Sequence, residues 1–359
     1  MNVLDKFGVA ADAAPVHGKR IPKKVHNRVA HIDADFIAYQ IASDTKEELS
    51  GDRPLRPIEY KLAQIEDIAG EIMDRAGASK FVLHVTPSAS TKGNRAAQAV
   101  QKEYQANRLG RDKPEHLDAI RAEIARSSGY RHGIGVAHLD QEADDALVQA
   151  NLGDIKNSVL CSRDKDLRMA AGWHMDMDTD ELVWVEPGDF GHIDLVEKVS
   201  ESGKSKTKKI VGYGPKFFWA QCLMGDTADN VAGLPEVAVY SNLRLFGGDA
   251  FNADLELFRN PETSETQKNR IKAKWVKTKK CGPAGAFELL HNVENNKAAF
   301  TRVRDLFNEV NRVAGYKFTH WKTGAEVTPT QALLGDMQLL WMRETKNEND
   351  VVRWLKTFA

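Results

Sequence analysis

Short apolar segments that alternate with longer amphipathic segments constrain the fold of this chain more than any other feature. Apolar runs of strand length occupy residues 29–33, 80–85, 134–138 and 158–161. Residues 59–75 and 142–152 carry apolar side chains at helical spacing between these runs. Strands that alternate with helices predict an α/β fold with a parallel sheet covered by helices.

The composition of the chain changes along its length. Residues 1–28 combine basic side chains with Gly and Pro, which predicts a flexible, solvated basic tail. The strand and helix alternation fills residues 29–200 and ends in a hairpin pattern at 173–186. A Gly/Lys/Ser run at 202–209 predicts an exposed loop. The pattern of residues 201–359 is mainly helical, so we place a domain change near residue 200.

Composition excludes several classes of protein. The 42% hydrophobic and 28% charged residues are an ordinary globular balance. No run approaches 18 apolar residues, so we expect no membrane span. The 3 cysteines are far apart and form no disulfide or metal motif, which favours a reducing, cytoplasmic location. A formal net charge of −1 argues, taken alone, against a nucleic-acid partner.

Carboxylates gather where the predicted strands end. The set comprises Asp33 at the end of the first strand, Glu142, Asp144 and Asp145 at a helix start, Asp164 and Asp166 after a buried strand, and Asp226 and Asp229 in a later turn. Each alone is explained by a helix cap, a helix dipole or a solvated turn. The carboxyl ends of parallel strands share one edge, so acids that converge there repel unless cations neutralise them. Oxygen-only ligands suit Mg²⁺ or Mn²⁺, and two such ions about 3.5–4 Å apart promote attack of water on a phosphodiester.

The order of these motifs resembles that of the flap-endonuclease-like 5′ nucleases, which include phage 5′→3′ exonucleases and the 5′-nuclease domain of bacterial DNA polymerase I. Five separated motifs in residues 29–290 carry the resemblance: His31–Asp33, Tyr104–Arg108, Glu142–Asp145, Asp164–Asp166 and Gly225–Pro235. A weaker similarity covers 331–344. The resemblance implies a PIN-like parallel sheet flanked by helices, with a helical arch at about 90–130. It also implies a helical helix-three-turn-helix DNA-binding region, interrupted here by an insertion at about 236–280.

Residue roles follow from the resemblance. It implies that two Mg²⁺ ions, or Mn²⁺ in their place, are held by the eight acids, one by Asp33, Glu142, Asp144 and Asp164 and the other by Asp145, Asp166, Asp226 and Asp229. It assigns phosphate activation or base stacking to Lys92, Arg95, Lys102, Tyr104 and Arg108. It assigns DNA binding to Arg111, Lys113, Lys279, Lys280, Gly282 and Gly285, with K⁺ as a further candidate ion at this glycine hairpin.

The chain departs from the family pattern at four points. Thr86 stands near the position of a further family carboxylate, so the set is one acid short unless Asp35 contributes. Gln40 and Gln105 replace basic residues, the second of them in the arch. The insertion at 236–280 separates the Gly225–Pro235 motif from its glycine hairpin.

The leading hypothesis is a Mg²⁺-dependent 5′→3′ exonuclease of DNA replication or recombination. Its substrate is double-stranded DNA with a free or flapped 5′ end. Flap endonuclease activity and RNA-primer removal from an RNA–DNA hybrid are further expectations, and a phage-encoded chain would act in a bacterial host cell. One alternative is a catalytically inactive, structure-selective DNA-binding module, and another is a PIN-like RNA nuclease. The net charge of −1 fits the leading hypothesis, because the chain outside the eight acids carries +7.

Overall fold

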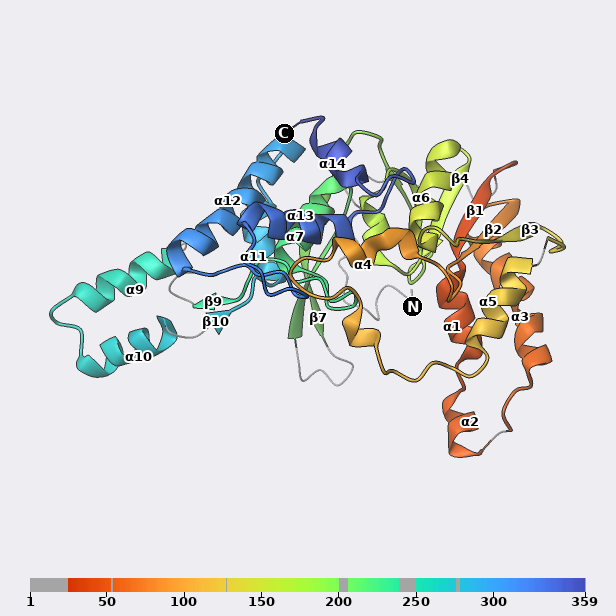
Figure 1. Ribbon diagram of the computed structural model, residues 1–359, viewed down its shortest axis with the longest axis horizontal. Coiled ribbons are helices and arrows are strands. Elements are labelled where there is room, and N and C mark those ends of the chain that lie inside the picture. Colours follow the sequence, from red (N-terminus) through yellow and green to blue (C-terminus); the bar gives the residue numbers. More distant parts are fainter. Residues whose placement is uncertain are drawn as a thin grey trace, which may run out of the picture. The chain divides into compact units, whose positions relative to one another are not determined.

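The computed structural model describes residues 25–52, 54–126, 128–199, 206–238, 249–275 and 278–358. The chain forms two compact units, each with its own core (Figure 1). Unit 1 takes those described residues that fall within 25–93, 112–191 and 342–347, and unit 2 takes those within 94–111, 192–341 and 348–358. The main boundary between the units therefore falls between Gly191 and His192. In addition, residues 94–111 belong to unit 2 and residues 342–347 belong to unit 1.

Unit 1 is built on a six-stranded sheet in the order β3-β2-β1-β4-β5-β6. Its strands are β1 (Val29–Asp33), β2 (Lys80–Val85), β3 (Gly133–Ala137), β4 (Ser158–Ser162), β5 (Gly172–Asp176) and β6 (Leu182–Val185). Neighbouring strands pair in parallel except β5 with β6, which form the predicted hairpin. This topology confirms the predicted α/β class with a parallel sheet.

Helices cover both faces of this sheet. Helices α1 (Ala34–Ala42), α3 (Ile58–Arg75) and α5 (Leu117–Arg126) enclose the main apolar core with one face, and α6 (Ala143–Gly153) packs on the other face against β1, β2 and β4 (Figure 1). The short helices of this unit are α2 (Lys46–Ser50) and η4 (Lys165–Met169). Strands β1, β2 and β4 thus run between two helical layers, and their carboxyl ends meet at one edge.

The first described residues differ from the expected tail. Residues 1–24 of the predicted basic tail lie outside the described residues. Val25 already donates its N–H to the Gly77 carbonyl. Arg28 is buried, and its guanidinium lies 5.9 Å from the ring centroid of Trp173. Residues 25–28 therefore belong to the fold of unit 1, which the tail interpretation missed because their basic side chains carry no apolar pattern.

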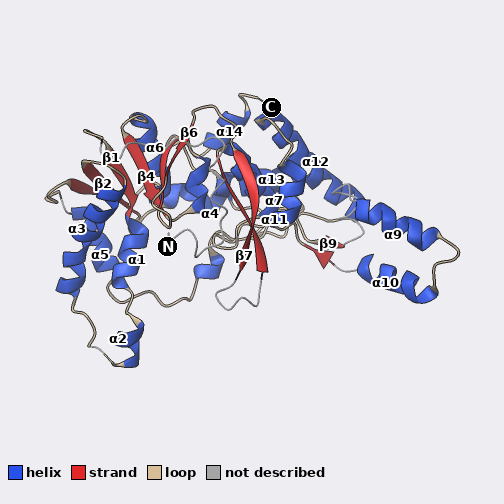
Figure 2. Cartoon of the chain, turned by 180° about the vertical axis from the view of Figure 1, so that it is seen from behind, coloured by secondary structure: helices blue, strands red, loops and turns tan. Residues whose placement is uncertain are grey.

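Unit 2 combines a β-ribbon with a helical core. Strands β7 (His192–Val199) and β8 (Lys206–Tyr213) form the antiparallel ribbon (Figure 2). The prediction of a loop at 202–209 is therefore wrong for residues 206–209, because their backbone pairs with Val196–Val199 of β7. The core helices are α7 (Pro215–Met224), α11 (Pro283–Leu290), α12 (Asn296–Ala314), α13 (Pro329–Leu340) and α14 (Asp350–Leu355).

Two further parts of unit 2 matter for the predicted motifs. The insertion folds as β9 (Val237–Ala238), α9 (Asp249–Arg259), α10 (Glu265–Trp275) and β10 (Thr278–Lys279). The predicted arch is divided: η2 (Lys92–Asn94) stands at the change of unit, α4 (Arg95–Gln98) and η3 (Ala106–Arg108) belong to unit 2, and α5 belongs to unit 1. No helix within the described ranges is both long and apolar enough to span a membrane.

Candidate metal centre and nucleic-acid interface

The ends of β1 and β4 are joined by Ser162, which bonds to the Asp33 carboxylate and to the Asp164 backbone. Asp33 caps α1, where its Oδ1 accepts the Asp35 N–H at 2.9 Å. Ser162 donates its hydroxyl to Asp33 Oδ2 at 2.9 Å, and the Ser162 Oγ accepts the Asp164 N–H at 2.9 Å. The two predicted ligands from different strands, Asp33 and Asp164, therefore share one hydrogen-bond network.

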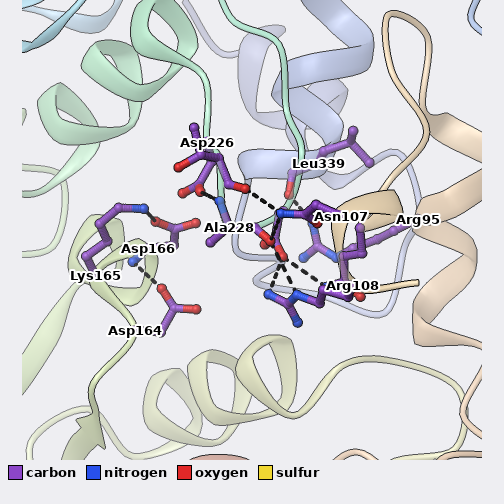
Figure 3. A network of polar contacts seen from close by, with 12 residues as sticks. Arg95, Asn107, Arg108, Asp164, Lys165, Asp166, Asp226, Ala228 and Leu339 are labelled. Carbon is purple, nitrogen blue, oxygen red and sulfur yellow. Dashed lines mark hydrogen bonds and ion pairs between the residues drawn. The ribbon is translucent and has the colours of Figure 1, made fainter. Parts of the chain in front are cut away.

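The acids after β4 form the first turn of η4. Asp164 Oδ1 accepts the N–H of Asp166 at 2.8 Å, so Asp164 caps this short helix (Figure 3). The Asp166 side chain is buried, and its Oδ1 pairs with the Lys165 Nζ at 3.0 Å. These contacts fix both carboxylates at the edge of the sheet, as the sequence predicted from the strand end.

The first turn of α6 completes this cluster. Glu142 is the N-cap residue, and the Asp144 carboxyl lies near Asp33 and Asp164. Burial, followed by the charges of these two acids, raises the pKa of Asp144 well above its usual range. Burial and the charge of Asp35 raise the pKa of Asp33 to about 6. These directions show that the carboxylates are close enough to disfavour one another's ionisation.

Asp35 lies beside the cluster but is occupied. Its Oδ1 accepts the Arg121 Nε–H at 3.0 Å, and its Oδ2 accepts the Thr86 N–H at 3.1 Å. The Thr86 hydroxyl in turn accepts the Ala143 N–H at 2.9 Å. Thr86 therefore orients the start of α6 and Asp35 together, in place of the acid expected there. Sequence reasoning missed Arg121, because no local pattern links α5 to the end of β1.

The donor set of unit 1 fits a hard divalent cation. Asp144 Oδ1 is buried and, among the described residues, has no hydrogen-bond partner, and it is surrounded by other carboxylates. An oxygen-rich, mutually repelling set of this kind suits Mg²⁺ or Mn²⁺. Within the described ranges, no three Asp, Glu, His or Cys side chains are arranged as a ready coordination shell. The fit therefore rests on the kind of donor and on the buried Asp144 oxygen.

Asp145 has different surroundings from Asp144. The Asp145 side chain is fully buried, and its Oδ1 accepts the Arg343 N–H at 2.8 Å. Arg343 also donates from its Nη1 to the Gly93 carbonyl at 2.8 Å. Asp145 thus anchors the segment 342–347 on unit 1, which argues against its predicted role as a metal ligand. Successive helical residues point about 100° apart, so Asp144 and Asp145 have different neighbours.

In unit 2, the turn Gly225–Asn230, here called the acid turn, carries the last two predicted ligands. Asp226 Oδ1 accepts the Ala228 N–H at 2.6 Å, and the backbone of Asp226 pairs with Val231 in both directions. Gly225 and Gly233 have φ of +68° and +69°, and a Cβ on Gly233 would lie 2.2 Å from the Gly225 nitrogen. Only glycine fits this close crossing of two backbones.

The segment Asn94–Arg111, here called the strap, packs on the acid turn and on α13. Asp229 Oδ1 accepts hydrogen bonds from Gln105 Nε2 at 3.0 Å and from Arg108 Nη2 at 2.6 Å. Asn107 Nδ2 donates to the Thr227 carbonyl at 2.6 Å (Figure 3). The Arg108 side chain remains 52% exposed.

Two predicted phosphate or base contacts are directed into unit 2 instead. Arg95 is fully buried and donates to the carbonyls of Leu339 and Trp341, at 2.8 and 3.0 Å, where α13 ends (Figure 3). Tyr104 is 9% exposed. The predicted roles of Arg95 in phosphate activation and of Tyr104 in base stacking therefore do not fit this structure. Arg95 thereby holds the strap on the end of α13.

Other predicted basic contacts are accessible. Lys102, Arg111 and Lys113 are exposed, and Lys92 is half-buried. Burial and the neighbouring Lys102 lower the pKa of Lys280, so these two cations lie close together. Gly282 is the N-cap of α11 and makes no side-chain cap, Gly285 lies in the first turn, and the side chain of Lys279 lies outside the described residues.

Comparisons with known proteins give distant similarities. No protein-family model matches the chain. No curated protein matches it either. Among solved structures, a bacteriophage T5 flap endonuclease in a complex with DNA and metal ions gives a TM-score of 0.36 at 12% identity, covering 88% of this chain and 99% of that one. A T5 protein co-crystallized with metal ions gives 0.33 at 13% identity, covering 80% and 94%.

A third solved structure has another origin. The catalytic core of Rad2 in complex with a DNA substrate gives a TM-score of 0.35 at 10% identity, covering 83% of this chain and 91% of that one.

Proposed function

We propose that this protein is a metal-dependent nuclease that hydrolyses phosphodiester bonds of duplex DNA from a 5′ end. One observation carries the proposal: the buried Asp144 oxygen without a hydrogen-bond partner, among carboxylates at the carboxyl edge of a parallel sheet. Such desolvated carboxylates are costly unless a cation offsets their charge. A protein that only bound DNA would gain nothing from so much negative charge beside phosphate.

The proposed metal ligands in unit 1 are Asp33, Glu142, Asp144, Asp164 and Asp166. Bound divalent ions would lower the pKa of the attacking water and neutralise charge on the leaving oxygen. The protein's own part is to hold the carboxylates in place: Ser162 links Asp33 to Asp164 by hydrogen bonds on both sides. The expectation that Asp226 of unit 2 contributes to a second ion stays a prediction.

Unit 2 offers the proposed contacts to the DNA backbone. Lys102 and Lys280 lie close enough for one charge to affect the other, and the uncapped start of α11 at Gly282 follows directly. Clustered cations and free backbone N–H groups bind phosphate without reading base sequence. These features support recognition of duplex shape, and preference for a free or flapped 5′ end is part of the proposal.

The test uses duplexes labelled at the 5′ or the 3′ end, blunt, nicked or flapped, incubated with Mg²⁺, Mn²⁺ or EDTA. We expect metal-dependent release of product from the 5′ end, and loss of at least a hundredfold in rate for the double variant Asp164→Ala, Asp166→Ala, as for removal of a group essential to charge stabilisation. The matched control is Asp178→Ala, an exposed acid in the β5–β6 turn. Cleavage that survives the double substitution, or no cleavage with either metal, would contradict the proposal.

A further inference from the structure

The strap and the acid turn are held together by more than one kind of contact. Gln105 donates its backbone N–H to the Asp229 carbonyl at 3.0 Å, and Asn230 Nδ2 donates to the Glu103 carbonyl at 2.8 Å. Asn107 adds bonds to the carbonyls of Thr227 and Ala228. Two segments far apart in the sequence are thus bonded at the level of the backbone, independently of any charge.

A single carboxylate closes this contact. Asp229 Oδ1 receives both the Gln105 side-chain amide and the Arg108 guanidinium, and the Asp229 side chain is 17% exposed. A charge-assisted bond from an arginine is roughly twice as strong as a neutral one. The guanidinium charge at this oxygen also repels a metal cation that approaches Oδ1. Gln105, the residue that departs from the family pattern, is the second donor.

The strap is also attached to unit 2 before Lys102, at Gln101. Gln101 Nε2 donates to Asp336 Oδ2 at 2.7 Å, and the same oxygen accepts the Gly233 N–H at 2.9 Å. Lys102 follows directly and is exposed. Lys102 therefore lies between two anchored residues of the strap: Gln101, held by Asp336, and Gln105, held by Asp229. The position of this lysine on unit 2 depends on both.

We propose that Asp229 is a positioning residue, which fixes the strap and its Lys102 through Gln105 and Arg108, and is not a metal ligand. The consequence for the nuclease is specific. Loss of Asp229 weakens DNA binding because the strap loosens, and the affinity for divalent metal is unchanged. The inference rests on the proposed function for its DNA and metal readouts, and the strap readout stands without either.

The experiment compares the full-length protein with Asp229→Asn, with the charge exchange Asp229→Arg plus Arg108→Asp, and with the control Asp305→Asn. Asp305 is an exposed acid of α12 that pairs with Arg304 at 2.9 Å. Three quantities are measured: Mn²⁺ affinity by calorimetry, the rate of trypsin cleavage within the strap, and the Kd for a nicked duplex in Ca²⁺. Trypsin cleavage is followed at Lys102 and Arg111, which every variant keeps.

We expect Asp229→Asn to speed strap cleavage by about tenfold, because the bond from Arg108 loses its charge assistance, and to raise the Kd for DNA. Its Mn²⁺ affinity should stay within about twofold of that of the natural protein, and the exchange variant should recover slow cleavage. Weakening of Mn²⁺ binding by tenfold or more in both variants would overturn the inference. So would strap cleavage no faster than in Asp305→Asn. A protein that binds no DNA at all would contradict the proposed function and leave the metal and trypsin tests valid.

Discussion

At the scale of single residues, neighbouring acids of one motif have different roles. Asp144 and Asp145 are adjacent in the first turn of α6, yet only Asp144 joins the carboxylate cluster. Asp145 accepts a backbone N–H from the returning C-terminal segment. Asp164 and Asp229 differ in a similar way, because the Asp229 carboxylate accepts a hydrogen bond from the Arg108 guanidinium. A motif of acids therefore contains both candidate ligands and anchors.

This difference predicts opposite effects for two conservative substitutions. Asp144→Asn removes a carboxyl group whose ionisation is opposed by burial and by its acidic neighbours, so it should raise the free energy of unfolding in EDTA and abolish tight Mn²⁺ binding. Asp145→Asn should lower the free energy of unfolding by about 1–3 kcal/mol, because a buried hydrogen bond is weakened, with little change in Mn²⁺ affinity. Urea unfolding and calorimetry measure both quantities. Equal losses of Mn²⁺ affinity in the two variants would contradict the assignment.

At the scale of elements, α13 links the strap to the acid turn within unit 2. Arg95 donates to carbonyls at the end of the helix, and Asp336 in its middle accepts from Gln101 and Gly233. A Cβ on Gly335 would lie 2.5 Å from a methyl of Val100, so the strap lies directly on the helix. The position of the strap on α13 therefore depends on the buried Asp336.

The buried acid Asp336 predicts a dependence of stability on pH. Burial raises its pKa to about 7 from an ordinary value of 3.8. Between about pH 4 and pH 7 the unfolded chain loses this proton and the folded protein keeps it. The contribution of Asp336 to the free energy of unfolding therefore falls as the pH rises through this range, and it is constant above about pH 7. The full change is roughly 4 kcal/mol. Below about pH 4, where Asp336 is protonated in both states, the free energy of unfolding carries no penalty from this group.

Asp336→Asn keeps a neutral acceptor for Gly233 and removes the titration. The difference in the free energy of unfolding between this variant and the natural protein should therefore grow from pH 4.5 to pH 7 and then level off. Urea unfolding at a series of pH values measures it, with Asp305→Asn as the exposed control. A difference that does not change with pH would show that Asp336 is already ionised in the folded protein at pH 4.5.

At the scale of the whole molecule, the distribution of charge matters more than its sum. The chain has a formal net charge of −1, but acids gather at the sheet edge of unit 1 and Lys102 and Lys280 gather in unit 2. Carboxylates without their cations repel phosphate. Affinity for nucleic acid can therefore depend on metal although the net charge is almost zero.

Metal removal should weaken DNA binding as well as cleavage. We expect the Kd for a nicked duplex to rise by about tenfold or more when EDTA replaces Ca²⁺ at constant ionic strength, because the carboxylates then repel the backbone. Fluorescence anisotropy measures this Kd. In Asp144→Asn the rise should be smaller, since one repelling charge is gone. An equal Kd in EDTA and Ca²⁺ would separate DNA binding from the carboxylate cluster.

The sequence alone determined the elements whose signals are local. Apolar runs of strand length and helical spacing predicted β1, β2, β4 and α6, because burial between two layers leaves a pattern within each segment. The same local reading placed Asp33, Asp144 and Asp164 at strand ends or a helix start. Acids at the carboxyl ends of parallel strands must share an edge, so their convergence was predictable.

The tertiary structure decided which acids and cations are already occupied. Arg121 on Asp35, Arg343 on Asp145 and Arg108 on Asp229 are contacts between segments far apart in the chain. No spacing within the sequence records such a partner, because the packing of separate segments sets the distance. The same reason buried Arg95 and tied the strap to unit 2. Sequence chemistry defined the set of candidates, and packing selected the members that remain available to a ligand.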